Sequence, residues 1–74
     1  MRIVLDIETN LEFDRIWCVV VRDIDTDNVA AFRDTEEERI LLSLMLMNAE
    51  KIIMHNGIFF DAPMLKKIWG ITMK

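Results

Sequence analysis

The chain has 74 residues with 13 acidic and nine basic side chains, which gives a formal net charge of −4 at pH 7. This length allows one small domain, and 53% hydrophobic residues with 30% charged residues is typical of a globular rather than a disordered chain. The acidic balance argues against nucleic-acid binding without chemistry, because such proteins hold phosphates through a basic surface. There is no apolar stretch long enough to span a bilayer and no secretory signal. The single cysteine, Cys18, is expected to be an inert core residue in a reduced, cytoplasmic setting.

The hydrophobic pattern predicts the order β-β-β-α-β-α along the chain. The first strand is expected at about residues 2–8, and a nearly continuous apolar run at residues 15–23 predicts a strand buried on both faces. Asp25-Thr26-Asp27-Asn28 is a turn cluster, because Asp and Asn bond to their own backbone and tolerate left-handed geometry. A short third strand, residues 29–33, would then pair back as a hairpin.

A helix is expected from residue 34 to about residue 50. Two pairs have capping-box spacing at its start, Thr35 with Glu38 and Asp34 with Glu37. Acidic side chains in the first turn also interact favourably with the helix dipole. A solvated, well-capped helix end therefore explains these acids without any function.

The segment Ile40–Met47 of this helix is apolar nearly all round, whereas an ordinary amphipathic helix has a polar face. We therefore expect another polypeptide or a second copy of the chain to cover it. A fourth strand is predicted at residues 51–55 and a last helix at residues 58–69, with Pro63 in its first turn. Gly70 is expected to close that helix.

Asp6 and Glu8 stand at the end of the first apolar strand. Because side chains alternate along a strand, Ile3, Leu5 and Ile7 share one face and the two carboxylates share the other. The roots of the two carboxylates lie about 7 Å apart, close enough for both to reach one hard cation. Two carboxylates on one face at a strand end are hard to explain as packing, and oxygen ligands favour magnesium or manganese.

A third acid follows the fourth strand in the segment His55-Asn56-Gly57-Ile58-Phe59-Phe60-Asp61. Taken alone, Asp61 is explained as a carboxylate at a helix N-terminus, and His55 as a hydrogen-bonded structural residue. If the fourth strand lies beside the first, the turn after it opens at the sheet edge where Glu8 ends. Asp61 could then face the pair, and three converging carboxylates would require cations.

These residues carry a family resemblance. Asp6-Ile7-Glu8-Thr9 resembles the first motif of the DEDD 3′–5′ exonucleases, and His55–Asp61 resembles their second motif, in the form found in proofreading domains of phage-type family A DNA polymerases. The resemblance covers essentially the whole chain and implies a ribonuclease H-like α/β fold. It also implies a cytoplasmic protein, located in a bacterial host if a phage encodes it.

The resemblance assigns roles to individual residues. Asp6, Glu8 and Asp61 would bind two Mg²⁺ or Mn²⁺ ions that activate water and stabilise the leaving oxygen, with Glu8 also near the 3′ hydroxyl of single-stranded DNA. The remaining substrate-binding candidates are Thr9 in the first motif, Asn56 and Phe60 beside the terminal nucleotide, and Leu11 as a wedge between the last bases. Trp17 and Trp69 are expected to be core or interface aromatics.

A departure from the family leaves two functions open. The family has a third motif that supplies a fourth aspartate and a residue that orients the attacking water, and residues 70–74 contain no substitute. Residues 1–74 are therefore expected to form a partial exonuclease-like domain that is weak or inactive until a further segment or subunit completes it. The alternative is a non-catalytic module that acts by self-association or protein binding, including inhibition.

Overall fold

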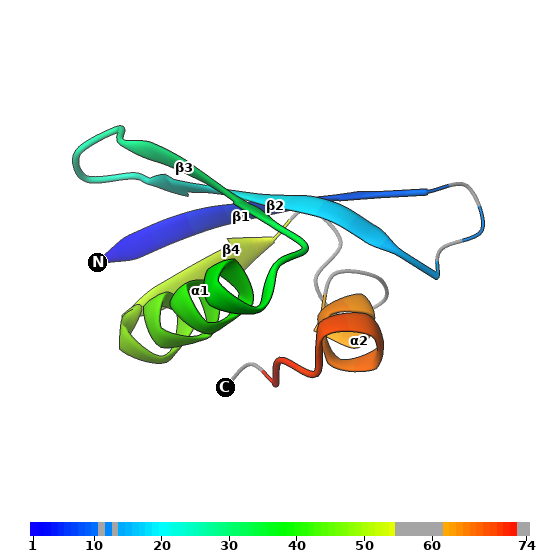
Figure 1. Ribbon diagram of the computed structural model, residues 1–74. Coiled ribbons are helices and arrows are strands. Elements are labelled where there is room, and N and C mark those ends of the chain that lie inside the picture. Colours follow the sequence, from blue (N-terminus) through cyan, green and yellow to red (C-terminus); the bar gives the residue numbers. More distant parts are fainter. Residues whose placement is uncertain (11, 13, 55–61, 73–74) are drawn as a thin grey trace.

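The computed structural model describes residues 1–10, 12, 14–54 and 62–72, and in them four strands form one mixed sheet with the order β3-β2-β1-β4 (Figure 1). The strands are β1 (Arg2–Thr9), β2 (Ile16–Asp23), β3 (Val29–Arg33) and β4 (Lys51–Met54). β1 pairs antiparallel with β2, and β2 pairs antiparallel with β3, whereas β4 runs parallel to β1. The hypothesis that the fourth strand lies beside the first is therefore confirmed.

The helices lie on one face of this sheet (Figure 1). α1 (Glu36–Asn48) joins β3 to β4, and α2 (Ala62–Met64) continues directly into a π-helical turn, η2 (Leu65–Trp69). We call the face beneath these helices the covered face; no described element covers the opposite face, which we call the open face. The predicted order of elements and a small mixed α/β fold are confirmed. The predicted start of the last helix, at residue 58, lies outside the described residues.

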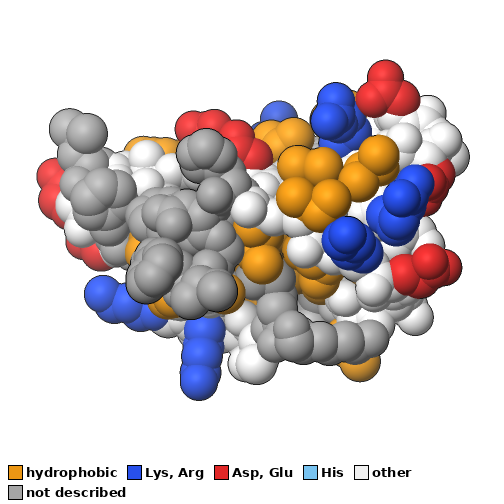
Figure 2. All heavy atoms as spheres, turned by 180° about the vertical axis from the view of Figure 1, so that it is seen from behind, with side chains coloured by type: hydrophobic (Ala, Val, Ile, Leu, Met, Phe, Trp, Pro, Cys, Tyr) orange, Lys and Arg blue, Asp and Glu red, His pale blue; other side chains and the backbone are white. Residues whose placement is uncertain are grey.

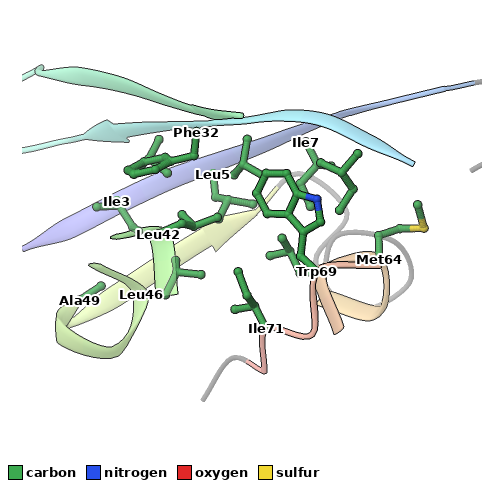
Figure 3. Packing of buried hydrophobic residues seen from close by; sticks show 14 residues of the cluster. Ile3, Leu5, Ile7, Phe32, Leu42, Leu46, Ala49, Met64, Trp69 and Ile71 are labelled. Atoms are coloured by element: carbon green, nitrogen blue, oxygen red, sulfur yellow. The ribbon is translucent and has the colours of Figure 1, made fainter. Parts of the chain in front are cut away.

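The core lies between the covered face and the helices. Ile3 and Leu5 of β1 are fully buried, and Ile7 is 7% exposed. Figure 3 shows Leu42 of α1 close to the side chains of β1, with Trp69 reaching the same cluster from the C-terminal helix. Burial of an aliphatic or aromatic side chain of this size contributes roughly 1.5–3 kcal/mol. The alternation of apolar residues in β1 therefore fixes which face receives the helices.

Local capping fixes where α1 begins. The Thr35 hydroxyl accepts a hydrogen bond from the Glu38 backbone N–H at 3.2 Å and donates one to the Glu38 carboxylate at 3.0 Å. The Arg33 backbone N–H donates to the same carboxylate at 3.1 Å. Of the two predicted capping pairs, Thr35 with Glu38 is the one that forms, and Asp34 instead pairs with Arg39 at 3.7 Å.

The C-terminal helix ends as predicted. Gly70 adopts a left-handed conformation with φ of 69°, and its backbone N–H donates to the carbonyl of Leu65. A residue with a side chain rarely adopts this conformation, because its Cβ approaches the following carbonyl oxygen. The glycine therefore turns the chain so that Ile71, which is 6% exposed, packs back on the core.

Two expectations about β2 are wrong. The strand is not buried on both faces: Ile16, Val19 and Val21 are buried, while Val20 is half-buried on the open face. The apolar run therefore packs against one layer of helices within the described residues. Cys18 also lies on the open face and is half-buried, so it is not a core residue.

Candidate functional site

Asp6 and Glu8 lie on the open face of β1 and are both exposed. In the β1–β2 ladder Asp6 is paired with Val20 and Glu8 with Cys18, so the two carboxylates follow one another along the same side of the sheet. The predicted sharing of one face is therefore present. In the view from behind, hydrophobic side chains reach the surface between acidic groups and a group of Lys and Arg side chains (Figure 2).

The parallel strand β4 ends beside this pair. Its last residue, Met54, is paired with Leu5, the residue that precedes Asp6 in β1. The carboxyl ends of parallel strands meet at one edge of a sheet, where α/β proteins bind their ligands. The surface is hollowed at this edge, and the depression is lined by Val4, Leu5, Asp6, Ile53 and Met54.

The carboxylates of Asp6 and Glu8 are not engaged by other groups in the described part of the chain. Neither forms a hydrogen bond or an ion pair there, whereas Asp25, Asp27 and Asp34 each pair with an arginine. An exposed carboxylate pair without a cationic partner keeps its oxygen atoms available for a ligand. Within residues 1–10, 12, 14–54 and 62–72, neither packing nor internal pairing thus explains the positions of these two residues.

The residues of the second motif cannot be added to this geometry. His55, Asn56, Phe60 and Asp61 lie outside the described residues, as does Leu11. Thr9 is described: it is paired with Ile16, alternates to the side of the sheet opposite Glu8, and is half-buried. Its side chain therefore lies on the covered side of the sheet rather than beside the two carboxylates.

The described donors fit a hard cation but do not complete a site for one. Within residues 1–10, 12, 14–54 and 62–72 no group of three or more His, Cys, Asp or Glu side chains could hold a metal ion. Asp6 and Glu8 nevertheless supply carboxylate oxygens from one face, which is the ligand type that Mg²⁺ and Mn²⁺ prefer. A metal site here would need a third ligand from elsewhere, for which Asp61 is the candidate from the sequence.

Sequence reasoning missed one surface feature close to the pair. Trp17, expected in the core or at an interface, is 52% exposed, and the Arg15 guanidinium carbon lies 4.5 Å from the centroid of its ring. Trp69, the other tryptophan, is buried as expected for a core residue. The spacing Arg-x-Trp directly after a polar loop was the signal available in the sequence, but apolar neighbours on both sides of Trp17 concealed it.

Comparisons with known proteins do not assign the chain to a family. No model of a known protein family matches the chain, and no curated protein matches it either. The resemblance to DEDD exonucleases therefore depends on the residues of the two motifs. None of the helices in the described ranges has the length and apolar character needed to cross a membrane.

Proposed function

We propose that this chain is a ribonuclease H-like 3′–5′ exonuclease domain that hydrolyses the 3′ ends of single-stranded DNA with divalent cations. The observation that carries the proposal is the exposed carboxylate pair Asp6 and Glu8 on the open face, beside the carboxyl end of a parallel strand and without an ion-pair partner among the described residues. The sheet order and the helices on its covered face are compatible with that fold. The motif resemblance supplies the reaction class.

Asp61 is proposed as the third ligand. The segment that contains it begins directly after Met54, and Met54 is paired with the neighbour of Asp6. It ends where α2 begins at Ala62. In this proposal the three carboxylates hold two cations, which would supply the positive charge that activates water and stabilises the leaving oxygen. A further segment or subunit supplies the fourth carboxylate and the group that orients the water.

The direct test uses DNA labelled at its 5′ end and incubated with the purified chain and Mn²⁺. We expect fragments that shorten from the 3′ end with wild-type protein and none with Asp6→Asn. A matched control is Asp27→Asn, which makes the same chemical change in the loop at the opposite end of β2 and should leave activity intact. Equal shortening by the wild type and Asp6→Asn would show that the activity belongs to another protein in the sample.

A binding measurement separates an incomplete site from an absent one. Mn²⁺ is paramagnetic, so it should broaden the amide NMR signals of Asp6 and Glu8 before those of Asp27 or Glu37. If the signals near Asp6 and Glu8 no longer broaden first in Asp6→Asn, the carboxylate pair is the site that binds Mn²⁺. If Mn²⁺ broadens the amide signals of all exposed acidic residues alike, the chain has no selective cation site and the proposed function fails.

The outward side of α1 favours a second candidate, a module that acts by self-association or protein binding. Its large apolar residues Ile40, Leu41, Leu44 and Met47 are each between 51% and 58% exposed. The expected cover over this helix is thus not provided by the described part of the chain, and a second copy or a completing polypeptide would bury it.

Sedimentation velocity tests this second candidate. If α1 mediates self-association, Leu44→Glu should shift the chain to monomer. Ile53→Glu, which charges an exposed apolar residue of β4, should leave the assembly unchanged. A wild-type chain that remains monomeric at high concentration would exclude self-association and leave a different polypeptide as the partner of α1.

A further inference from the structure

Trp17 occupies an irregular position in β2. The β1–β2 register pairs Glu8 with Cys18 and Thr9 with Ile16, so Trp17 is an extra residue with no partner of its own on β1. Such a β-bulge redirects the side chain of the strand that carries it, and bulges are frequent beside functional sites. Here the redirected side chain is the largest in the strand, and half of it is exposed.

The Arg15 guanidinium lies over this indole. Its central carbon is 4.5 Å from the ring centroid, within the range of a cation–π interaction. The guanidinium forms no ion pair within the described residues, although Arg2, Arg22 and Arg39 each pair with an aspartate. Its positive charge is therefore available to an anion from outside the chain.

The backbone beneath the pair is held by Asn10. The Asn10 side-chain oxygen accepts hydrogen bonds from the backbone N–H groups of Asp14 at 3.2 Å and Arg15 at 3.0 Å. The Asn10 backbone N–H in turn donates to the Arg15 carbonyl at 3.2 Å. Arg15 is thus anchored to the end of β1, which limits where its guanidinium can lie.

The backbone at Trp17 lies near the backbone at Glu8, one of the proposed metal ligands. Cys18, the neighbour of Trp17, is paired with Glu8, and paired residues of antiparallel strands have Cα atoms about 4.5–5.5 Å apart. One step along the chain adds about 3.8 Å, so the Cα atoms of Trp17 and Glu8 lie within roughly 10 Å of each other. This distance suits contacts to neighbouring parts of one ligand.

We propose that Trp17 and Arg15 bind single-stranded nucleic acid, with the exposed indole stacked on a base and the guanidinium paired with a phosphate. An exposed aromatic ring beside an arginine is the combination that single-strand binding uses, because every base offers a flat face to stack and the arginine attracts a phosphate. The inference rests on the proposed function, since it takes single-stranded DNA as the substrate from that proposal.

Trp17 serves as its own reporter of binding. The purified chain is titrated with a short oligothymidylate in EDTA at low salt, so that hydrolysis is absent, and tryptophan fluorescence is followed. Stacking should quench the exposed Trp17, while the buried Trp69 gives a constant background. Trp17→Leu should remove the fluorescence change and weaken binding roughly 5-fold to 150-fold, measured by anisotropy of a labelled oligonucleotide.

Arg15 is tested through the salt dependence of the same binding. Arg15→Gln should lower the slope of log K against log salt concentration by about 0.7, the value for one phosphate contact on a single strand. Val29→Ala, which changes an exposed apolar residue at the far end of the sheet, should alter neither affinity nor slope.

The outcomes separate this inference from the proposed function. If oligothymidylate quenches Trp17 but the DNA is not shortened from its 3′ end in Mn²⁺, the binding proposal is supported and the proposed catalytic activity is contradicted. If Asp6→Asn loses the 3′ shortening but Trp17→Leu shortens DNA with an unchanged KM, the catalytic proposal is supported. The same result overturns the proposal that Trp17 binds the substrate. Absence of quenching in the wild type, or equal affinities of wild type and Trp17→Leu, also overturns it.

Discussion

On the covered face of β1, Ile3, Leu5 and Ile7 are buried beneath the helices, whereas on the open face of the same strand Asp6 and Glu8 are exposed and unpaired within the described residues. The two sets alternate residue by residue, since a strand directs successive side chains to opposite sides. One strand therefore supplies the centre of the core and the candidate site at once. Substitutions in β1 can therefore alter the core and the candidate site separately, even at adjacent positions.

The largest expected effect comes from the covered face. Leu5→Ala removes a fully buried side chain and should lower the free energy of unfolding by about 2–5 kcal/mol, which approaches the whole stability of a domain this small. Val4→Ala, at the next position on the open face, should cost less than half as much because Val4 is only half-buried. Urea unfolding followed by circular dichroism measures both.

Ile3→Val keeps this test usable if Leu5→Ala does not fold. It deletes one buried methyl group and should cost about 0.5–1.5 kcal/mol. Equal losses for Leu5→Ala and Val4→Ala would mean that the open face is also packed in solution. The distinction between the two faces would then be wrong.

A smaller effect is expected at the start of the helix that covers the core. Thr35→Ala removes the hydroxyl that accepts the Glu38 backbone N–H and should cost about 1 kcal/mol. Thr35→Ser keeps that hydroxyl and should retain most of the stability. Because Thr35 lies away from the open face, neither change should alter Mn²⁺ binding at Asp6 and Glu8. A loss of binding in folded Thr35→Ala would show that the two faces are coupled.

Much of this fold was accessible from the sequence because its signals are local. Alternation in β1, the capping pair Thr35 with Glu38, and Gly70 after the last helix each depend on residues within a few positions of one another. The turn after β2 is similar: Asp27 has a φ of 62°, the left-handed geometry expected of that cluster. These features do not require knowledge of the rest of the molecule.

The features that could not be predicted depend on distant partners. A continuous apolar run does not reveal how many layers will pack against it, so β2 was wrongly expected to be buried on both faces. The exposure of Trp17 depends on a mismatch in the pairing of β1 with β2, which neither strand shows alone. For the candidate site, the shared face of Asp6 and Glu8 was predictable from the alternation along β1, while the contribution of Asp61 stays a prediction.

Changes to the two exposed carboxylates of the open face should barely affect stability. Asp6→Asn and Glu8→Gln alter exposed side chains without hydrogen bonds or ion pairs to described residues, so each should change the free energy of unfolding by no more than about 0.5 kcal/mol without divalent cations. Urea unfolding in EDTA is the measurement. A loss comparable to that of Thr35→Ala would mean that the two carboxylates have a structural role that explains their positions.

The smallest effect is expected from a charge pair at the start of β1. The hydrogen bond from the Arg2 guanidinium, 3.2 Å from its Nε atom to Asp25 Oδ1, lowers the pKa of the Asp25 carboxyl below its ordinary value. A carboxyl whose pKa is lower in the folded state stabilises the fold above its unfolded pKa, about 3.9. That contribution is lost as the pH falls through the lower folded value. Because the pair is exposed, the contribution should be slight and weaker still at high salt.

Thermal unfolding of wild type and Asp25→Asn tests this pH dependence. The wild type should have the higher midpoint at neutral pH, and the two should converge as the pH falls below about 4. In an Arg2→Gln background Asp25→Asn should have no effect, because the partner that lowers the pKa is gone. A difference that persists in that background would mean that the Asp25 carboxylate stabilises the fold through something other than its pair with Arg2.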